Sequence, residues 1–325
     1  MERNPGKVWR TAAIALAAVL ALLMGAPYLV PLSAPPALAA PGPFNNSATQ
    51  VVRGTPFHFR TYAPQGAPSG KMLLVHGLGG STFSFEEAAP ALAAQGLLVV
   101  SVDLPGFGYS ARDPEYDHSQ ANRARDVWAL LDALDATLEP AFAAAPWFLG
   151  GHSMGGGTVA AMAMADAPRT RGLVLIDAAL FETPRSEAAS FPPVLRWTQV
   201  VLERFLINER NIARMLASAY GREPTAEQVQ GYLAPLRLPG TARALRNFVL
   251  TSRNEDPSRL AGLGVPILAV WGSEDAWVPI TELDRLRELV PEASAYIVQG
   301  AGHCPMETHP EEFVAAVWDW MSGLE

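Results

Sequence analysis

The chain has 325 residues, of which 49% are hydrophobic and 17% are charged, and its formal net charge is −8. This composition is typical of a globular protein with a large core, and the acidic balance excludes nucleic-acid binding through a basic surface. The single cysteine, Cys304, excludes an intrachain disulfide framework.

The N-terminal segment, residues 1–32, is predicted to be a membrane anchor. Arg3, Lys7 and Arg10 precede residues 11–32, an uncharged apolar stretch. At about 1.5 Å per residue, this stretch just spans a hydrocarbon core of ~30 Å. Because a basic flank stays on the cytoplasmic side, we expect a single-pass protein of the cell membrane with the rest of the chain outside the cytoplasm.

A cleaved signal peptide is the alternative for this segment. Residues 37–39 (ALA) precede Ala40 and fit a signal peptidase site, although they lie far beyond the apolar core. Cleavage near Ala39 would give a secreted or periplasmic protein. The Pro-rich residues 33–50 are predicted to form an extended stalk.

Beyond the stalk, short apolar runs alternate with helical patterns. Residues 71–75 and 97–102 are predicted strands, and residues 84–95 and 119–138 are predicted helices. This alternation indicates βαβ units and therefore a mostly parallel sheet.

Glycine-rich loops follow both of these strands. In residues 76–80 (HGLGG) the glycines let the backbone approach a ligand closely, and the N–H of Leu78 is a predicted oxyanion donor. The next loop, residues 103–110 (DLPGFGYS), begins with Asp103. We expect this carboxylate to brace the turn by accepting hydrogen bonds from backbone amides.

Residues 151–155 (GHSMG) have the spacing of a nucleophile elbow. They lie between the apolar run 146–149 and a small-residue stretch, which is the required strand–turn–helix setting. The turn projects the Ser153 hydroxyl beyond the sheet edge, and the N–H of Met154 points to where an oxyanion forms. His152 is expected to position its neighbours rather than act as a base.

Between residues 181 and 264 the strand pattern gives way to helical patterns, over residues 193–207, 209–220, 225–233 and 241–253. This insertion is a predicted lid. Its apolar residues recur at helical spacing and either bury the lid against the sheet or line an acyl pocket: Phe191, Val194, Trp197, Val201, Phe205 and Leu206. Its arginines are expected mostly on the solvated surface, with contact to an anionic substrate or lipid head group as the alternative.

A serine nucleophile needs an imidazole base and an acid that orients it. Asp275 follows the predicted strand 265–271, and His303 follows the predicted strand 295–298. Ser153, Asp275 and His303 therefore occur in the Ser–Asp–His chain order, with Asp177 and Glu274 as alternative acids. Cys304 is expected to be a small packed residue, because Ser153 already fills the role of nucleophile.

Together these motifs resemble the α/β-hydrolase fold family in its lid-bearing form. The resemblance covers about residues 55–324 and implies a hydrolase domain over residues 51–325. It implies a mostly parallel eight-stranded sheet with helices on both faces and a lid inserted after the sixth strand, over about residues 181–264. It also implies acyl-enzyme hydrolysis without a cofactor or metal. Related epoxide hydrolases and haloalkane dehalogenases need a carboxylate at the elbow, so Ser153 excludes their chemistry.

The sequence therefore predicts a serine hydrolase that cleaves a small-molecule carboxylic ester with an apolar acyl group. The same triad acting on a thioester, amide, lactone, C–C bond or peracid is the second interpretation. A non-catalytic ligand-binding protein on the same scaffold is the third, and the intact set of motifs argues against it.

Overall fold

The computed structural model describes residues 5–34, 42–182 and 191–324. Within them, eight strands form one sheet in the order β1-β2-β4-β3-β5-β6-β7-β8. The strands are β1 (Ser47–Val52), β2 (Thr55–Tyr62), β3 (Gly70–Val75), β4 (Leu97–Val102), β5 (Trp147–His152), β6 (Thr170–Ile176), β7 (Ile267–Gly272) and β8 (Ser294–Val298).

The sheet is parallel except at one edge, where β1 pairs antiparallel with β2 and β2 pairs antiparallel with β4. From β4 to β8 every pairing is parallel. The carboxyl ends of these strands therefore meet at one edge of the sheet, which is where α/β proteins place their ligands.

The first strand corrects the predicted stalk. Residues 33–50 were expected to be extended and outside the fold, but β1 begins at Ser47 and pairs with β2. Arg53 and Gly54 join the two strands with φ values of 51° and 88°. Positive φ at both central residues is typical of the tight hairpin turn that matches the strand twist. Residues 35–41 lie outside the described residues.

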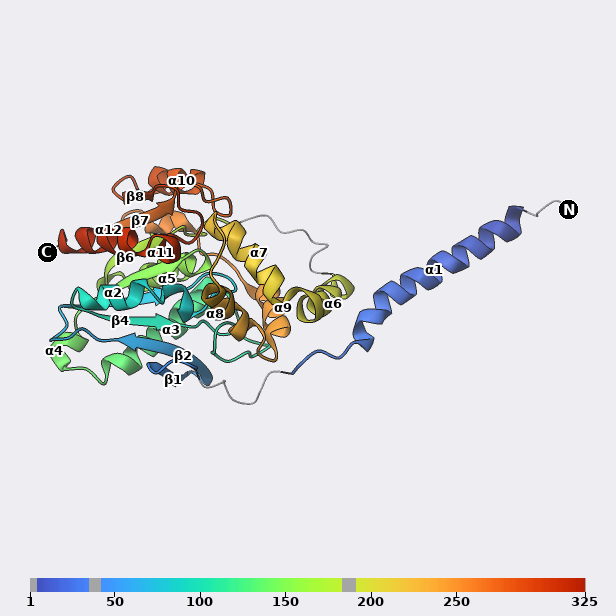
Figure 1. Cartoon of the computed structure of the whole chain (residues 1–325), viewed down its shortest axis with the longest axis horizontal. Coiled ribbons are helices and arrows are strands. Elements are labelled where there is room, and N and C mark those ends of the chain that lie inside the picture. The colour runs from blue at the N-terminus through green and yellow to red at the C-terminus, as the bar shows by residue number, and fades with distance from the viewer. Residues whose placement is uncertain (1–4, 35–41, 183–190, 325) are drawn as a thin grey trace.

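Helices cover both faces of the sheet (Figure 1). The helices of the described residues are α1 (Pro5–Leu29), α2 (Ala88–Ala94), α3 (Gln120–Asp135), α4 (Pro140–Ala143), α5 (Met154–Ala165), α6 (Pro192–Val201), α7 (Glu209–Tyr220), α8 (Ala226–Leu236), α9 (Thr241–Thr251), α10 (Thr281–Leu289), α11 (Pro305–Thr308) and α12 (Pro310–Ser322). Short helical turns are η1 (Thr82–Phe85), η2 (Ala167–Arg169), η4 (Leu202–Leu206, a π-helical turn) and η5 (Pro257–Leu260).

The two faces follow from strand alternation. In β3, Leu73 and Val75 pack with α3, α5 and α10, whereas Met72 and Leu74 pack with α2 and α12. Successive side chains of a strand point to opposite faces, so one continuous apolar run supplies both halves of the core. The predicted fold class, a mostly parallel sheet between helices, is confirmed.

The insertion between β6 and β7 is helical, and we call α6, η4, α7, α8 and α9 the cap. The helix predicted over residues 193–207 ends at Val201 and continues as the turn η4. Asn208 caps α7 by accepting from the Asn211 N–H, and Thr225 forms a capping box at the start of α8. These local signals place the cap helices close to their predicted positions.

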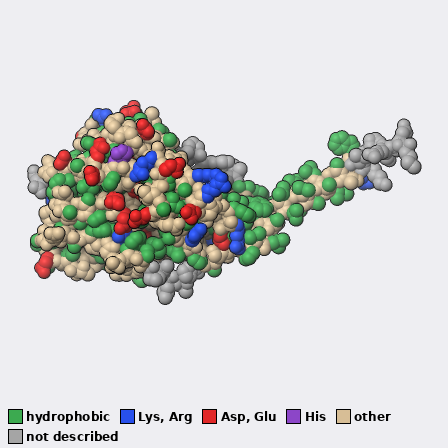
Figure 2. Space-filling view, in the orientation of Figure 1, with side chains coloured by type: hydrophobic (Ala, Val, Ile, Leu, Met, Phe, Trp, Pro, Cys, Tyr) green, Lys and Arg blue, Asp and Glu red, His purple; other side chains and the backbone are tan. Residues whose placement is uncertain are grey.

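The apolar stripe of the cap is not buried against the sheet as one interpretation expected. Phe191, Val194, Val201, Phe205 and Leu206 are exposed, and α6 instead buries Leu195 and Val200. An exposed apolar surface therefore runs along α6 and η4 (Figure 2 shows hydrophobic side chains gathered where the body meets α1). We call these five residues the apolar rim.

The cap is also joined to the N-terminal helix. Arg196 donates to the carbonyl oxygens of Pro27 and Val30, and Arg204 and Arg243 donate to those of Pro31 and Leu32. Arg204 is nevertheless exposed and Arg196 and Arg243 are half-buried, so these three arginines combine solvent contact with bonds to the N-terminal segment.

Further bonds reinforce this junction. Trp197 donates to the Leu23 carbonyl, and both the amide and the hydroxyl of Ser33 donate to the Glu203 carboxylate. Residues 23–33 thus lie on α6, η4 and α9, while the rest of α1 projects away from the body (Figure 1). We call residues 23–33 the docking segment.

Candidate active site

The turn between β5 and α5 holds Ser153 in a strained conformation, with φ 51° and ψ −117°. Such a backbone persists only where its surroundings enforce it. Two glycines make the close packing possible. A Cβ on Gly155 would lie 2.2 Å from the Val75 carbonyl oxygen, and one on Gly151 would lie 2.4 Å from the Gly155 carbonyl oxygen. The strand–turn–helix geometry predicted for residues 151–155 is therefore present.

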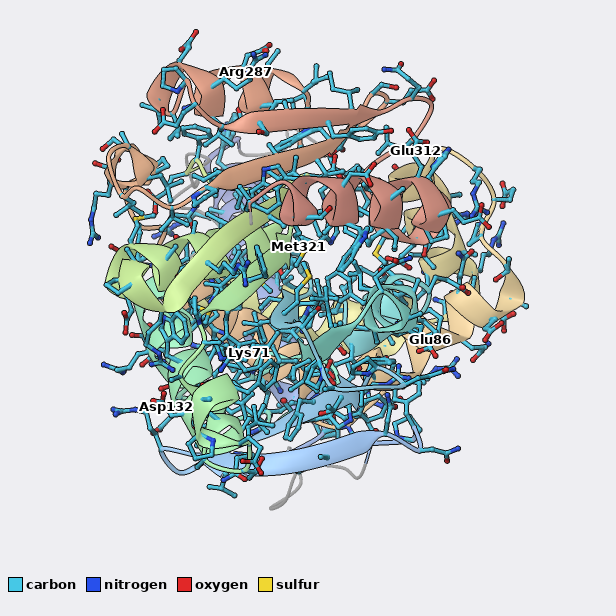
Figure 3. All side chains as sticks on the ribbon, turned by 90° about the vertical axis from the view of Figure 1, so that its left-hand side faces the viewer. Lys71, Glu86, Asp132, Arg287, Glu312 and Met321 are labelled. Carbon is cyan, nitrogen blue, oxygen red and sulfur yellow. The ribbon has the colours of Figure 1, made fainter. Side chains whose placement is uncertain are left out.

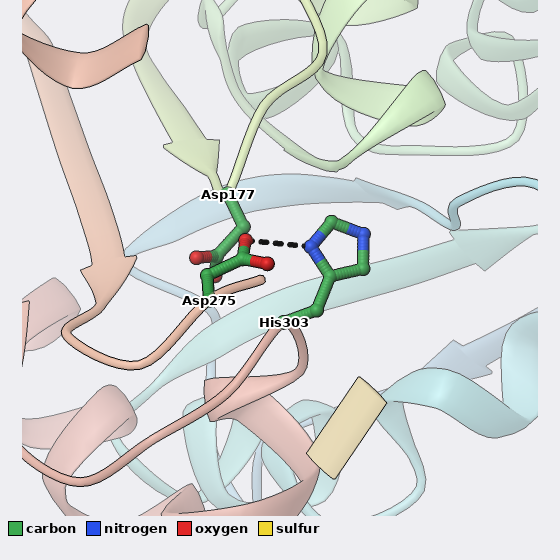
Figure 4. Close-up of side chains that lie close together, drawn as sticks. All are labelled: Asp177, Asp275 and His303. Atoms are coloured by element: carbon green, nitrogen blue, oxygen red, sulfur yellow. Dashed lines mark hydrogen bonds and ion pairs between the residues drawn. The ribbon is translucent and has the colours of Figure 1, made fainter. Parts of the chain in front are cut away.

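The loops after β7 and β8 bring Asp275 and His303 together. The His303 Nδ1 and Asp275 Oδ2 atoms are 2.7 Å apart in a buried contact (Figure 4). Asp275 Oδ1 accepts from the amides of Trp277 at 2.7 Å and Val278 at 3.0 Å. Burial alone would raise the pKa of the Asp275 carboxyl, but His303 and these amides outweigh it and lower that pKa below its ordinary value.

The two alternative acids differ from Asp275 in their surroundings. Glu274 is exposed, whereas Asp275 is buried. Asp177 is fully buried beside Asp275, with Oδ1 accepting from the Gly272 amide at 2.9 Å and Oδ2 lacking a partner. Burial, and then the charge of Asp275, raise the pKa of Asp177 well above its usual range. The two adjacent carboxyl groups therefore have pKa values that are shifted in opposite directions, and Asp177 is the more readily protonated of the two.

Atoms of Asp177, Asp275 and His303 lie within 4.8 Å of one another, a spacing that a metal ion could use. The donor set fits a metal poorly, because His303 Nδ1 already bonds Asp275 and burial disfavours the ionised form of Asp177 that a metal ion would need. The cluster instead has the form of a histidine oriented by a carboxylate.

Two further side chains fix the position of His303. His152 Nε2 contacts the His303 carbonyl oxygen at 2.7 Å, and burial followed by the neighbouring His303 lowers the pKa of His152 to about 3. His152 is therefore neutral, in keeping with the predicted positioning role. Trp277 stacks on the His303 ring with centroids 5.4 Å apart and donates to Ser218 of the cap.

Sequence reasoning missed Trp277. The sequence does place Trp277 two residues after Asp275, and an aspartate side chain commonly accepts from the backbone N–H two residues later. Its stacking on a histidine 26 positions later in the chain is a tertiary contact that no local pattern encodes.

The predicted oxyanion donors lie on either side of Ser153. Leu78 belongs to the glycine-rich loop after β3, and Met154 is the first residue of α5. Among the described residues, neither amide N–H has a hydrogen-bond acceptor. Both are therefore available to a negatively charged oxygen beside the serine.

A cavity of about 590 Å³ opens at this site, between the sheet edge and the cap. Ser153, His303, Leu78 and Trp277 line its floor. Its other walls are mostly apolar and come largely from the cap: Leu202, Leu206, Ile207, Ile212, Met215, Leu216, Ala219, Tyr232, Leu236 and Leu245. The volume is typical of a small-molecule pocket. The acyl-pocket interpretation of the cap stripe is thus supported at Leu206.

Two other sequence expectations are confirmed. Asp103 is fully buried and braces its turn by accepting from the amides of Thr82 and Tyr109 and from His58. Cys304 is buried, and its burial raises the pKa of its thiol, so it is a packed residue rather than a nucleophile.

The model of a known family, the alpha/beta hydrolase fold, matches residues 71–310. The chain belongs to the α/β-hydrolase fold family. Proteins of known name that this hydrolase matches include Lipase 1 of Psychrobacter immobilis, which is 27% identical over 252 residues and is covered over 75% of both chains. The pimeloyl-[acyl-carrier protein] methyl ester esterase of Aeromonas hydrophila subsp. hydrophila is 27% identical over 252 residues, which cover 76% of this hydrolase and 93% of the relative.

A solved structure of a membrane phospholipase A, described as a bacterial virulence factor, also has this fold. Its TM-score is 0.68 at 20% identity, and the match covers 98% of this hydrolase and 99% of that chain. Such a distant likeness establishes the fold, and the relatives establish that this chain is a hydrolase.

Proposed function

We propose that this hydrolase cleaves a carboxylic ester through an acyl-enzyme intermediate, with Ser153 as nucleophile, His303 as base and Asp275 as the orienting acid. The observation that carries the proposal is the buried 2.7 Å contact between His303 and Asp275 in a cavity that Ser153 also lines. An oriented imidazole beside a serine on a strained elbow is the arrangement that acyl transfer requires.

The reaction takes place in two steps. Ser153 Oγ attacks the acyl carbon while His303 Nε2 takes its proton, and the amides of Leu78 and Met154 hold the oxyanion. His303 then protonates the leaving alcohol. Water, activated by the same imidazole, hydrolyses the acyl-enzyme. Each oxyanion donor is worth roughly 3–4 kcal/mol in the transition state.

The apolar walls of the 590 Å³ cavity favour an ester with an apolar chain. A thioester, amide, lactone, C–C bond or peracid reaction would use the same residues, and reaction with a panel of these substrates separates them.

Covalent labelling tests the assignment of the nucleophile. A fluorophosphonate probe should label the Ser153 peptide in mass spectrometry, and Ser153→Ala should abolish labelling and lower ester turnover by about 10⁶-fold. Ser84→Ala is the matched control, because Ser84 lines the same cavity but hydrogen-bonds to Tyr232. Labelling that persists in Ser153→Ala would sink the assignment.

We also propose that α1 anchors the protein in a membrane, with the hydrolase domain outside the cytoplasm. Residues Trp9–Leu29 form a helix that is long and apolar enough to cross a membrane, a property that signal sequences share. In the most apolar stretch of this helix only 6% of the residues are buried. The docking segment favours an uncleaved anchor, because cleavage near Ala39 would remove a segment that the cap holds through Arg196, Arg204 and Glu203. The apolar rim beside α1 would then face the bilayer surface.

A further inference from the structure

Arg123, in the first turns of α3, has no role in the chemistry above, and its surroundings are unusual. The other buried cations of the described residues have hydrogen-bond partners. Lys71, labelled in Figure 3, bonds Asp135 and the Ala143 carbonyl. Arg60 bonds Glu86 and Asn46, and Arg112 bonds one hydroxyl and three carbonyl oxygens.

Among the described residues, no hydrogen bond from the Arg123 guanidinium is found. Arg123 is 1% exposed, and its Nε and Nη1 atoms are buried without an acceptor among the described residues. The nearest aromatic ring is Phe248, 5.6 Å from the guanidinium carbon. Burial, and then the charge of Arg123, lower the pKa of the neighbouring His118 to about 3, so His118 is neutral and supplies no countercharge. The nearby carboxylate of Asp117 raises the pKa of Arg123, but Asp117 is exposed and the burial of Arg123 outweighs it.

An unpaired buried cation is costly, so its persistence needs a reason. Burial lowers the pKa of Arg123 to about 10, which still leaves the guanidinium charged at neutral pH. An anion bound next to the guanidinium would offset the free-energy cost of burying its charge.

Such a space exists beside the reaction centre. A second cavity, of about 330 Å³, is lined by Arg123 together with Ser153, Leu78 and Met154. It meets the apolar cavity at Ser153 and Leu78, which line both. One cavity is walled by apolar cap residues, whereas the other contains a charged guanidinium with unused donors.

Glu182 carries the other charge on the walls of this second cavity. Its side chain is exposed, and its Oε1 accepts from the Asn254 amide. Glu182 is therefore solvent-accessible and already bonded to Asn254. Among the described residues it forms no ion pair with the Arg123 guanidinium.

We propose that Arg123 binds an anionic group of the substrate, a carboxylate or a phosphate, across Ser153 from the apolar cavity. The inference rests on the proposed function, since it places the scissile ester at Ser153. The substrate class is then an amphiphilic ester with an apolar chain on one side and an anion on the other. A planar guanidinium suits this task because it offers paired donors to carboxylate or phosphate oxygens.

Matched substrates test the proposal on the full chain. The carboxylate arm compares the nitrophenyl monoester of glutarate with nitrophenyl hexanoate, and the phosphate arm compares lauroyl glycerol phosphate with monolauroyl glycerol. The measured quantity is the ratio of kcat/KM for the anionic ester to that for its neutral counterpart. Arg123→Met should lower this ratio by about ten- to a hundredfold in at least one arm, because a charge-assisted hydrogen bond is lost. Arg123→Lys should retain part of it.

Turnover of the neutral esters reports whether each variant is folded, and it separates the two proposals. If wild-type enzyme hydrolyses no ester, the proposed function fails. If it hydrolyses esters with a ratio that Arg123→Met leaves unchanged in both arms, the anion site fails while the function stands. A preference for anions that appears only in Glu182→Gln would show that Glu182 is the partner of Arg123, and would also overturn the proposal.

Discussion

At the scale of single residues, Asp177 and Asp275 lie side by side, yet their carboxyl pKa values are shifted in opposite directions. Each follows a strand of the parallel sheet, and β6 and β7 are neighbours, so both carboxyl groups reach the same place. A histidine and two backbone amides stabilise the charged form of Asp275. Asp177 accepts from one amide, and its complete burial destabilises the charged form. Environment therefore assigns their roles.

This difference predicts the effect of two matched substitutions. Asp275→Asn should lower kcat by about 10⁴-fold, because the amide leaves His303 in the wrong tautomer. Asp177→Asn should cost far less, because Asp275 is the carboxylate that bonds His303 and burial already disfavours the charged form of Asp177. Steady-state kinetics on one ester checks both variants. A greater loss in Asp177→Asn would contradict the assignment of the acid.

At the scale of elements, one carboxyl group fastens two cap helices to the core. Glu307 of α11 accepts from the Tyr220 hydroxyl of α7 at 2.7 Å and from the Tyr232 hydroxyl of α8. Burial raises the pKa of Glu307 from 4.5 to about 7, against the hydrogen bonds from the two tyrosines. Two cap helices are thus hydrogen-bonded to a carboxyl group whose charge changes near neutral pH.

The pH dependence of stability follows from that shift. The folded chain keeps the Glu307 proton to a higher pH than the unfolded chain, so the stabilising contribution is present below pH 4.5. It falls as pH rises from there to about 7, by roughly 3 kcal/mol in total. Glu307→Gln should remove this component, as measured by chemical denaturation at about pH 5 and about pH 8.

Glu311→Gln is the control for this measurement, because Glu311 is exposed on the next helix, α12. It should keep the wild-type dependence. Equal pH profiles for wild type and Glu307→Gln would show that Glu307 titrates as in the unfolded chain.

At the scale of the whole molecule, the junction between α1 and the cap joins the proposed anchor to the walls of the apolar cavity. Leu202 and Leu206 line that cavity from η4, and η4 also carries Glu203 and Arg204, which bond the docking segment. A substrate that reaches the cavity past the apolar rim would arrive from the bilayer side.

Two truncations separate anchoring from docking. Deleting residues 1–22 should release the protein from membranes while keeping the docking segment. Deleting residues 1–34 should also release it, and should lower its free energy of unfolding by about 1–3 kcal/mol relative to the shorter deletion, since hydrogen bonds to charged groups are lost. Cell fractionation, N-terminal sequencing and chemical denaturation provide the measurements.

The outcomes of this experiment distinguish the two topologies. A mature N-terminus at Ala40, with activity in a soluble exported fraction, would establish a cleaved signal. Activity confined to the cytosol would contradict both. Equal stability of the two truncated forms would show that the docking segment adds nothing to the cap.

The sequence by itself determined the fold class and the candidate triad, because both depend on local chemistry. Apolar runs of strand length between helical patterns are enough to predict a parallel sheet. The tight elbow admits only glycine at 151 and 155, so its motif is visible without any tertiary information. The start of β1 at Ser47 was missed, since the strand closely follows a Pro-rich segment that ends at Pro43.

Tertiary structure alone decided which partner each side chain meets. Asp177 and Asp275 both follow buried strands, and only the contact with His303 distinguishes them. Helical spacing placed Phe205 and Val201 on one apolar stripe, but only the tertiary structure shows that both residues of this stripe are exposed. Arg123 looks like any helical arginine in the sequence. The role proposed for Arg123 depends on the absence of an acceptor among the described residues around it. Residues from distant segments of the chain determine that environment.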